Sequence, residues 1–323
     1  MRNALRQHLP YLLILWILPA LVYLKTLQPS LYFIDAGATL GGAYTLGIPT
    51  PPGYPSYMVI AHLFTKIPWG TPLFRIQLFS ILSALMALTI VYFFIQKAWR
   101  SGAADDTRNT KTASLVAALA LGFSYQFWSQ TLNIQSYVFT DFLMLLTLFL
   151  VFFVKPGKRL LQLGALAALF ITIASGGSAV MIVTTAAAFL LILIYYWDEV
   201  GLAKLGILGV LVVLGVAIVY SYLPIRAQAR PFLNWGNPQT LELFWNHVHS
   251  AGTTFNDPIT GKVVGYNLSP IEFFKATPKY FELLFWQFTP FLLPIIGIGI
   301  FQLYKRNKRL FWILASVPIA NLV

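Results

Sequence analysis

Serial long apolar runs constrain the fold of this chain more than any other feature of its sequence. A bilayer is crossed by about 20 consecutive apolar residues in a helix. Of the 323 residues, 58% are hydrophobic and only 10% are charged, against about 25% charged in soluble domains. We therefore predict an all-α, polytopic membrane protein that forms a single membrane domain over residues 1–323. About nine spans are expected, at 11–27, 73–96, 113–128, 138–154, 160–175, 179–197, 205–223, 281–304 and 310–323.

The net charge of +12 reports membrane topology rather than nucleic-acid binding. Most of the 22 Lys and Arg residues fall in alternate short loops, at 2–6, 97–111, 155–159, 204 and 305–309. Short cytoplasmic loops carry such an excess, which predicts a cytoplasmic N-terminus, and the compact loops favour a bacterial plasma membrane over the endoplasmic reticulum. The chain has no cysteine, which excludes disulfides, thiolate metal sites and a cysteine nucleophile. The last run ends at Val323 without a closing loop, so we expect a further C-terminal part.

Two long segments remain for the non-cytoplasmic side, at residues 28–72 and 224–279. They collect much of the polar chemistry of the chain, namely Asp35, Arg226, Arg230, His247, His249 and Asp257. The stretch from Asp35 to Tyr57 is interrupted by glycine and proline, and we expect an irregular path there, followed by a half-helix or interfacial helix at 57–67. Irregular backbone at membrane depth is tolerated only where it lines protein or a wet cavity. Asp35 is therefore a candidate functional acid, with helix capping as the structural alternative.

Several other polar residues can each be interpreted in two ways. Arg226 and Arg230 suit a phosphate group, or they anchor a span end at the headgroups. Asp141 inside the fourth run is either a proton relay or a structural hydrogen-bond partner. His247 and His249 lack the neighbours of a metal site, and no metal ligands are predicted. The aromatic residues of 232–286 form an interfacial belt, part of which is a candidate groove for an isoprenoid tail.

Several motifs resemble one family. They are an early Asp-x-Gly at 35–37, Arg75 at the start of the next span, and the runs Ala43-Tyr44-Thr45-Leu46-Gly47-Ile48-Pro49, Pro51-Pro52-Gly53-Tyr54-Pro55, Phe127-Trp128-Ser129-Gln130, Tyr222-Leu223-Pro224-Ile225-Arg226 and Asn234-Trp235-Gly236-Asn237-Pro238. Together these runs resemble a family of polytopic proteins with a glycosyltransferase-C-type fold. That family includes the animal endoplasmic-reticulum protein O-mannosyltransferases that act on plexin-type ectodomains.

The resemblance implies transfer of a sugar from a polyprenyl-phosphate-linked donor to a protein or glycan acceptor on the non-cytoplasmic face. It implies that Asp35 is the general base, and the place of Arg226 at an outer membrane boundary favours a contact with the phosphate. Further substrate-binding positions are expected at Arg230, Tyr44, Tyr54, Arg75, Gln135, Tyr137 and Trp235. These residues do not specify a cofactor, and a requirement for a divalent cation stays open. The partners are the donor, the acceptor and the bilayer, without nucleic acid.

Some positions depart from the family pattern. Ala38, Thr50 and Gln135 stand where family members usually carry Glu, His and an acid. Two alternatives therefore remain beside the enzyme, a non-catalytic relative and a transporter or flippase of lipid-linked substrates. A transporter would need paired broken helices and polar residues near the midplane, whereas the irregular segments here are loops of unequal length.

Overall fold

The computed structural model describes residues 2–31, 35–100, 107–153, 197–249, 255–256, 263–264 and 270–322, together with the single positions 168, 171, 173, 190 and 194. The apolar runs expected at 160–175 and 179–197 lie almost wholly outside the described residues, as do Asp257 and the glycine pair at 176–177. The described part is almost entirely helical, which confirms the predicted all-α class. It also holds one short antiparallel pair, β1 (Phe255–Asn256) and β2 (Val263–Val264).

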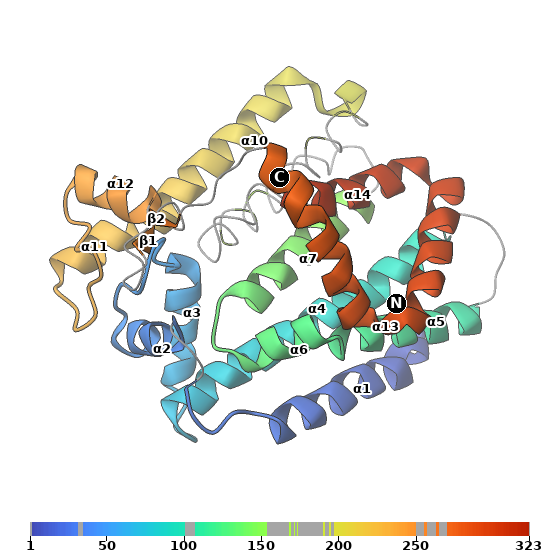
Figure 1. Cartoon of the computed structure of the whole chain (residues 1–323), viewed down its shortest axis with the longest axis horizontal. Helices are drawn as coiled ribbons and strands as arrows, with labels where there is room; N and C mark the ends of the chain where they lie inside the picture. Colours follow the sequence, from blue (N-terminus) through green and yellow to red (C-terminus); the bar gives the residue numbers. More distant parts are fainter. Residues whose placement is uncertain are drawn as a thin grey trace.

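Helix α4 (Pro72–Arg100) is the centre of the N-terminal half (Figure 1). It contacts α1 (Arg2–Lys25), α3 (Pro55–Thr65), α5 (Thr107–Gly122), α6 (Tyr125–Leu132) and α7 (Tyr137–Phe153). Buried side chains from α1 and α4, among them Leu15, Tyr23, Leu88 and Tyr92, form one core cluster. The hydroxyl of Tyr23 donates a hydrogen bond to the carbonyl of Gly122 at 2.6 Å. This bond satisfies a buried phenol and ties α1 to the end of α5.

Residues 35–45 are helical, so the prediction of an irregular path from Asp35 to Tyr57 is wrong for this part. They form α2 (Asp35–Thr45), while the turn that follows, at 46–54, is irregular as expected. Glycine weakens an isolated helix, but tertiary packing supplies most helix stability in proteins. Gly42 shows the reason, because a Cβ there would lie 3.0 Å from the sulfur of Met58 and 3.3 Å from Cδ of Pro49. The glycine permits α2 to pack closely against α3.

The C-terminal half begins with α10 (Trp197–Tyr220), which leads into α11 (Tyr222–Gln228) and then α12 (Leu241–His249). In Figure 1, α11 and α12 lie beside α2 and α3, although about two hundred residues separate them in sequence. Two further helices follow, α13 (Pro270–Arg306) and α14 (Lys308–Leu322), and they pack on each other.

Three helical stretches of the described residues are long and apolar enough to cross a membrane, at Arg6–Lys25, Pro72–Trp99 and Gly206–Gln228. The pair α6 and α7, bent by 119°, makes a fourth if it is counted as one broken span. These helices support the predicted membrane protein. The expected total of nine spans and the glycosyltransferase-C fold stay predictions.

Candidate functional site

The two long segments predicted for one side of the membrane meet in the structure. The amide of Ile48 donates to the carbonyl of Leu233 at 2.8 Å, and the amide of Trp235 donates to the carbonyl of Ile48 at 3.0 Å. Ile48 and Asn234 thereby form an isolated parallel bridge. Gly47 is required at this joint, because a Cβ there would lie 2.5 Å from the carbonyl oxygen of Leu233. The turn after α2 is thus fixed against the turn after α11.

Side chains of α11 strengthen the same joint. The hydroxyl of Tyr222 donates to the carbonyl of Gly47 at 2.7 Å. Arg226 donates from Nε to the carbonyl of Leu46 at 2.6 Å and from a terminal nitrogen to the carbonyl of Thr45 at 3.4 Å. These carbonyls follow the last turn of α2, where orphan acceptors and the negative end of the helix dipole favour a cation. Arg226 is therefore a structural clamp, and its guanidinium retains further N–H groups for another ligand.

Tyr54 lies within electrostatic range of both Asp35 and Tyr137, although the three residues come from the starts of different helices. Asp35 is the first residue of α2 and is half-buried. Tyr54 precedes α3 in a left-handed conformation (φ 45°). Burial, followed by the proximity of Tyr137, Asp35 and Tyr220, raises the pKa of Tyr54 to about 12. The Tyr54 phenol is consequently protonated at neutral pH and can donate a hydrogen bond beside the carboxylate.

The remaining predicted residues occupy different surroundings. Arg75 donates to the backbone carbonyls of Trp69 (2.9 Å), Thr65 (2.5 Å) and Gly70 (2.9 Å), so it closes the loop between α3 and α4. Gln135 is half-buried in the break between α6 and α7. Exposed side chains are found at Tyr44, Arg230 and Trp235. Substrate contacts for these residues stay predictions.

His247 is a residue of this region whose position the sequence did not indicate. It lies on α12 and is only 3% exposed, and neither of its ring nitrogens has a hydrogen-bond partner among the residues that the structure describes. A Cβ on Gly53 would lie 3.1 Å from its Nε2, and a Cβ on Gly236 would lie 2.9 Å from its Nδ1. Burial lowers the pKa of His247 to about 4. The neutral ring therefore fills the space between the two turns. Gly53 and Gly236, which leave room for the ring, are the only sign of this packing in the sequence.

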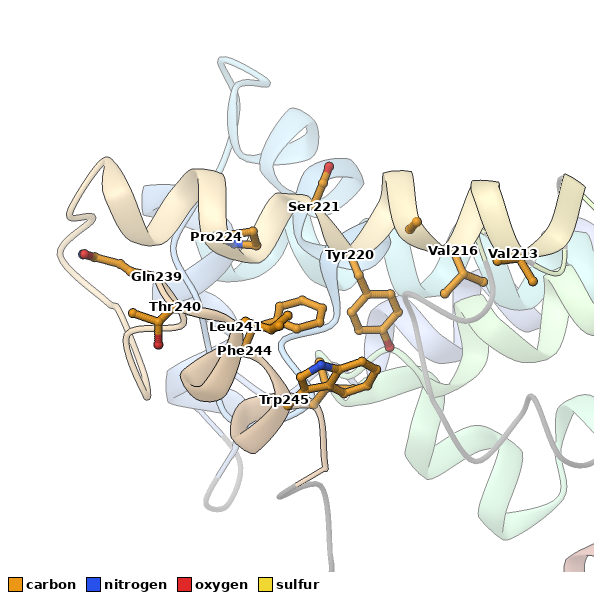
Figure 2. A pocket seen from close by; sticks show the side chains of 12 residues that line it. Val213, Val216, Tyr220, Ser221, Pro224, Gln239, Thr240, Leu241, Phe244 and Trp245 are labelled. Atoms are coloured by element: carbon orange, nitrogen blue, oxygen red, sulfur yellow. The ribbon is translucent and has the colours of Figure 1, made fainter. Parts of the chain in front are cut away.

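An apolar groove of about 600 Å³ runs along the same end of the molecule. Figure 2 shows Val216 and Tyr220 of α10 facing Phe244 and Trp245 of α12 across it. None of the described residues that line this groove is charged. Tyr220 also lies within electrostatic range of Tyr54, so the groove adjoins the cluster around Asp35. No group of three or more potential metal ligands occurs among the described residues.

Comparison with known proteins assigns the family. The sequence profile of the Protein O-mannosyl-transferase TMEM260 N-terminal domain matches residues 35–201. Asp35 is thus the first matched position, and the match includes Tyr54, Arg75 and Tyr137 but not Arg226. The mouse protein O-mannosyl-transferase TMEM260 is 28% identical over 133 residues, which are 40% of this chain and 18% of the mouse protein.

No solved structure matches this chain. The profile nevertheless covers more than half of the sequence, and the matched residues include the acid that the sequence motifs singled out. The chain therefore belongs to the family defined by the N-terminal domain of protein O-mannosyl-transferase TMEM260.

Proposed function

We propose that this chain carries the catalytic region of a membrane glycosyltransferase, which moves a mannosyl unit from a polyprenyl-phosphate donor to an acceptor hydroxyl. The observation that supports this most is the placement of Asp35. A half-buried carboxylate lies within electrostatic range of the protonated phenol of Tyr54, inside the residues that the family profile matches. A carboxylate in such a position suits general-base work on a hydroxyl.

The proposed reaction assigns one role to each of two residues. Asp35 accepts the proton of the acceptor hydroxyl, while the oxygen of that hydroxyl forms a bond to the anomeric carbon. The bond from that carbon to the phosphate oxygen breaks, and the electron pair leaves with the polyprenyl phosphate. Arg226 uses the N–H groups not engaged with Leu46 and Thr45 to stabilise the charge on the departing phosphate.

The apolar groove of α10 and α12 is the proposed place of the polyprenyl chain. It includes Tyr220, which is near the cluster of Asp35, and extends along α10, a helix that is apolar enough to span a membrane. A hydrocarbon chain gains free energy from such a surface in proportion to the apolar area it covers. We place the reacting groups at the non-cytoplasmic face, as the distribution of basic residues predicts.

A non-catalytic relative is the second candidate. Its support is Ala38, which lies one turn after Asp35 on α2 and is half-buried. Residues three apart share a helix face, so a family member with Glu at this position would have a second carboxylate beside Asp35. This chain has none there.

Sugar transfer by the whole protein tests the proposal. Membranes that contain it are incubated with radiolabelled mannose on polyprenyl phosphate, or on a nucleotide as the control donor. The proposal expects label in protein or glycan with the lipid-linked donor and background with the nucleotide, compared with membranes that lack the protein. Background incorporation with both donors would favour the non-catalytic relative.

A further inference from the structure

A second cavity, of about 550 Å³, lies at the bend between α6 and α7. Gln126 and Gln130 face it from α6, one helical turn apart, and Tyr137 and Asp141 face it from α7 with the same spacing. Gln287 of α13 completes the polar lining. Because side chains four apart share a helix face, the bend of 119° directs two pairs of polar groups into one space.

The chemistry of this lining selects a neutral ligand. Among the described residues that line it, Asp141 is the only acid and there is no Lys or Arg, which disfavours an anion such as phosphate. One carboxylate with amides is a poor site for a divalent cation, which is usually held by several acidic ligands. Each glutamine offers both donors and acceptors, and hydroxyl groups offer the same. The lining is thus complementary to a ligand rich in hydroxyl groups.

Gln130 shows that the cavity lacks a partner for its polar groups. Its Oε1 atom is buried and accepts no hydrogen bond from the described part of the chain. A buried acceptor without a partner costs about 1–3 kcal/mol, and most such groups in proteins are satisfied. Asp141, inside the apolar helix α7, is a further polar group of this lining, and acids at membrane depth are usually functional. A hydroxyl donor in the cavity would satisfy the oxygen of Gln130.

The cavity is connected to the proposed reaction centre through Tyr137. This residue lines the cavity and also lies within electrostatic range of Tyr54, which is itself close to Asp35. Tyr137 and Tyr54 therefore connect the cavity with the region of the carboxylate assigned as the base. Pockets of 300–1,000 Å³ are typical of small-molecule sites, and this one is within that range.

We propose that the cavity between α6 and α7 binds the hexose unit of the substrate, with Gln130 and Asp141 as hydrogen-bonding residues. This inference rests on the proposed function, because it places the sugar of that reaction. It also predicts binding that needs no transfer. The site recognises the ring hydroxyls, whereas the apolar groove holds the lipid.

Ligand-observed saturation-transfer NMR tests the binding directly. The probe is methyl α-D-mannopyranoside at tens of millimolar, with the whole protein in detergent micelles. We expect saturation transfer to the ring protons with wild type and with Asp35→Asn. We expect at least a fivefold smaller effect with Gln130→Leu and Asp141→Asn. Gln228→Leu, an exposed glutamine on α11, is the matched control and should behave as wild type.

The outcomes separate this inference from the proposed function. Sugar binding that depends on Gln130, without sugar transfer by any variant, would support the sugar site and contradict the proposed transferase function. Sugar transfer that needs Asp35, but has the same kcat and donor KM in Gln130→Leu as in wild type, would contradict the sugar site and leave the transferase function supported. Equal saturation transfer in wild type and both cavity variants, or none with any of them, also overturns it. Gln130→Leu removes an unpaired buried acceptor, so its unfolding temperature should not fall, and this measurement shows that the variant is folded.

Discussion

The Nε atom of Arg226 lies 2.6 Å from the carbonyl oxygen of Leu46 and donates a hydrogen bond to it across 180 residues of sequence. The last helix before the aromatic region is thereby attached to the turn that follows Asp35 and α2. Arg226 consequently influences the site in two ways, through this backbone contact and through the phosphate contact proposed for its other N–H groups.

Arg226→Lys should destabilise the joint between the two turns. A lysine keeps the positive charge but has no planar fork that reaches two carbonyls at once. Hydrogen bonds to charged groups contribute about 1.5–3 kcal/mol, and we expect a loss of that order in the free energy of unfolding. The measurement is thermal unfolding in detergent, with Arg230→Lys, an exposed arginine, as the control. Equal unfolding temperatures for both variants would contradict the clamp.

Gly53→Ala should destabilise the protein by about 1–3 kcal/mol. Gly53 has φ +89°, and an added Cβ would lie 2.5 Å from Cδ2 of Leu223 and 3.1 Å from Nε2 of His247. Gly41→Ala is the matched control, because its Cβ meets only Cδ2 of Leu233 at 3.7 Å, and alanine is favourable in a helix. The account expects a lower unfolding temperature for the first variant and an unchanged or higher one for the second.

His247 should make stability depend on pH. Burial lowers its folded pKa from 6.5 to about 4, so the folded protein holds the ring neutral while the unfolded chain takes up a proton below about pH 6.5. Stability is therefore complete above that pH and is lost as the pH falls toward 4. Thermal unfolding at pH 7.5, 6 and 5 should show a steeper loss for wild type than for His247→Gln, which does not titrate. Parallel curves would be the contrary result.

Filling the apolar groove should weaken mainly the binding of long-chain donors. Ala217 lines the groove, and Ala217→Trp should raise KM at least fivefold for a long polyprenyl donor, with a smaller effect on a short-chain analogue. Ile218→Trp is the control, because Ile218 is on α10 but 72% exposed and does not line the groove. The same change in KM for long and short donors would argue against a lipid chain in this groove.

Apolar runs were sufficient to predict helices α1, α4 and α10, because the bilayer demands their length and composition. They did not predict α2, since its three glycines weaken a helix locally, and the close packing of Gly42 on Met58 and Pro49 depends on contacts that the sequence does not show. Motif resemblance identified Asp35, Tyr54 and Tyr137, which the structure brings together. It did not indicate what Arg226 contacts.

The sequence could not predict features that depend on contacts between distant segments. His247 is buried between two turns that meet only in the folded chain, and its spacing from His249 carries no such information. Gln126, Gln130 and Asp141 became one site only because the bend between α6 and α7 turns their faces toward each other. Polar residues on short helices otherwise resemble ordinary interfacial positions.

The central claim is that Asp35 is the base of a sugar transfer, and Asp35→Asn tests it most directly. Asparagine keeps the shape and cannot accept the proton. The rate of mannose transfer from polyprenyl phosphate is measured for wild type, Asp35→Asn and Glu242→Gln, whose parent carboxylate is exposed on α12. At equal amounts of folded protein, the account predicts a loss of at least 100-fold for Asp35→Asn, the scale of general-base catalysis, and no loss for Glu242→Gln. Wild-type rates in Asp35→Asn would contradict it.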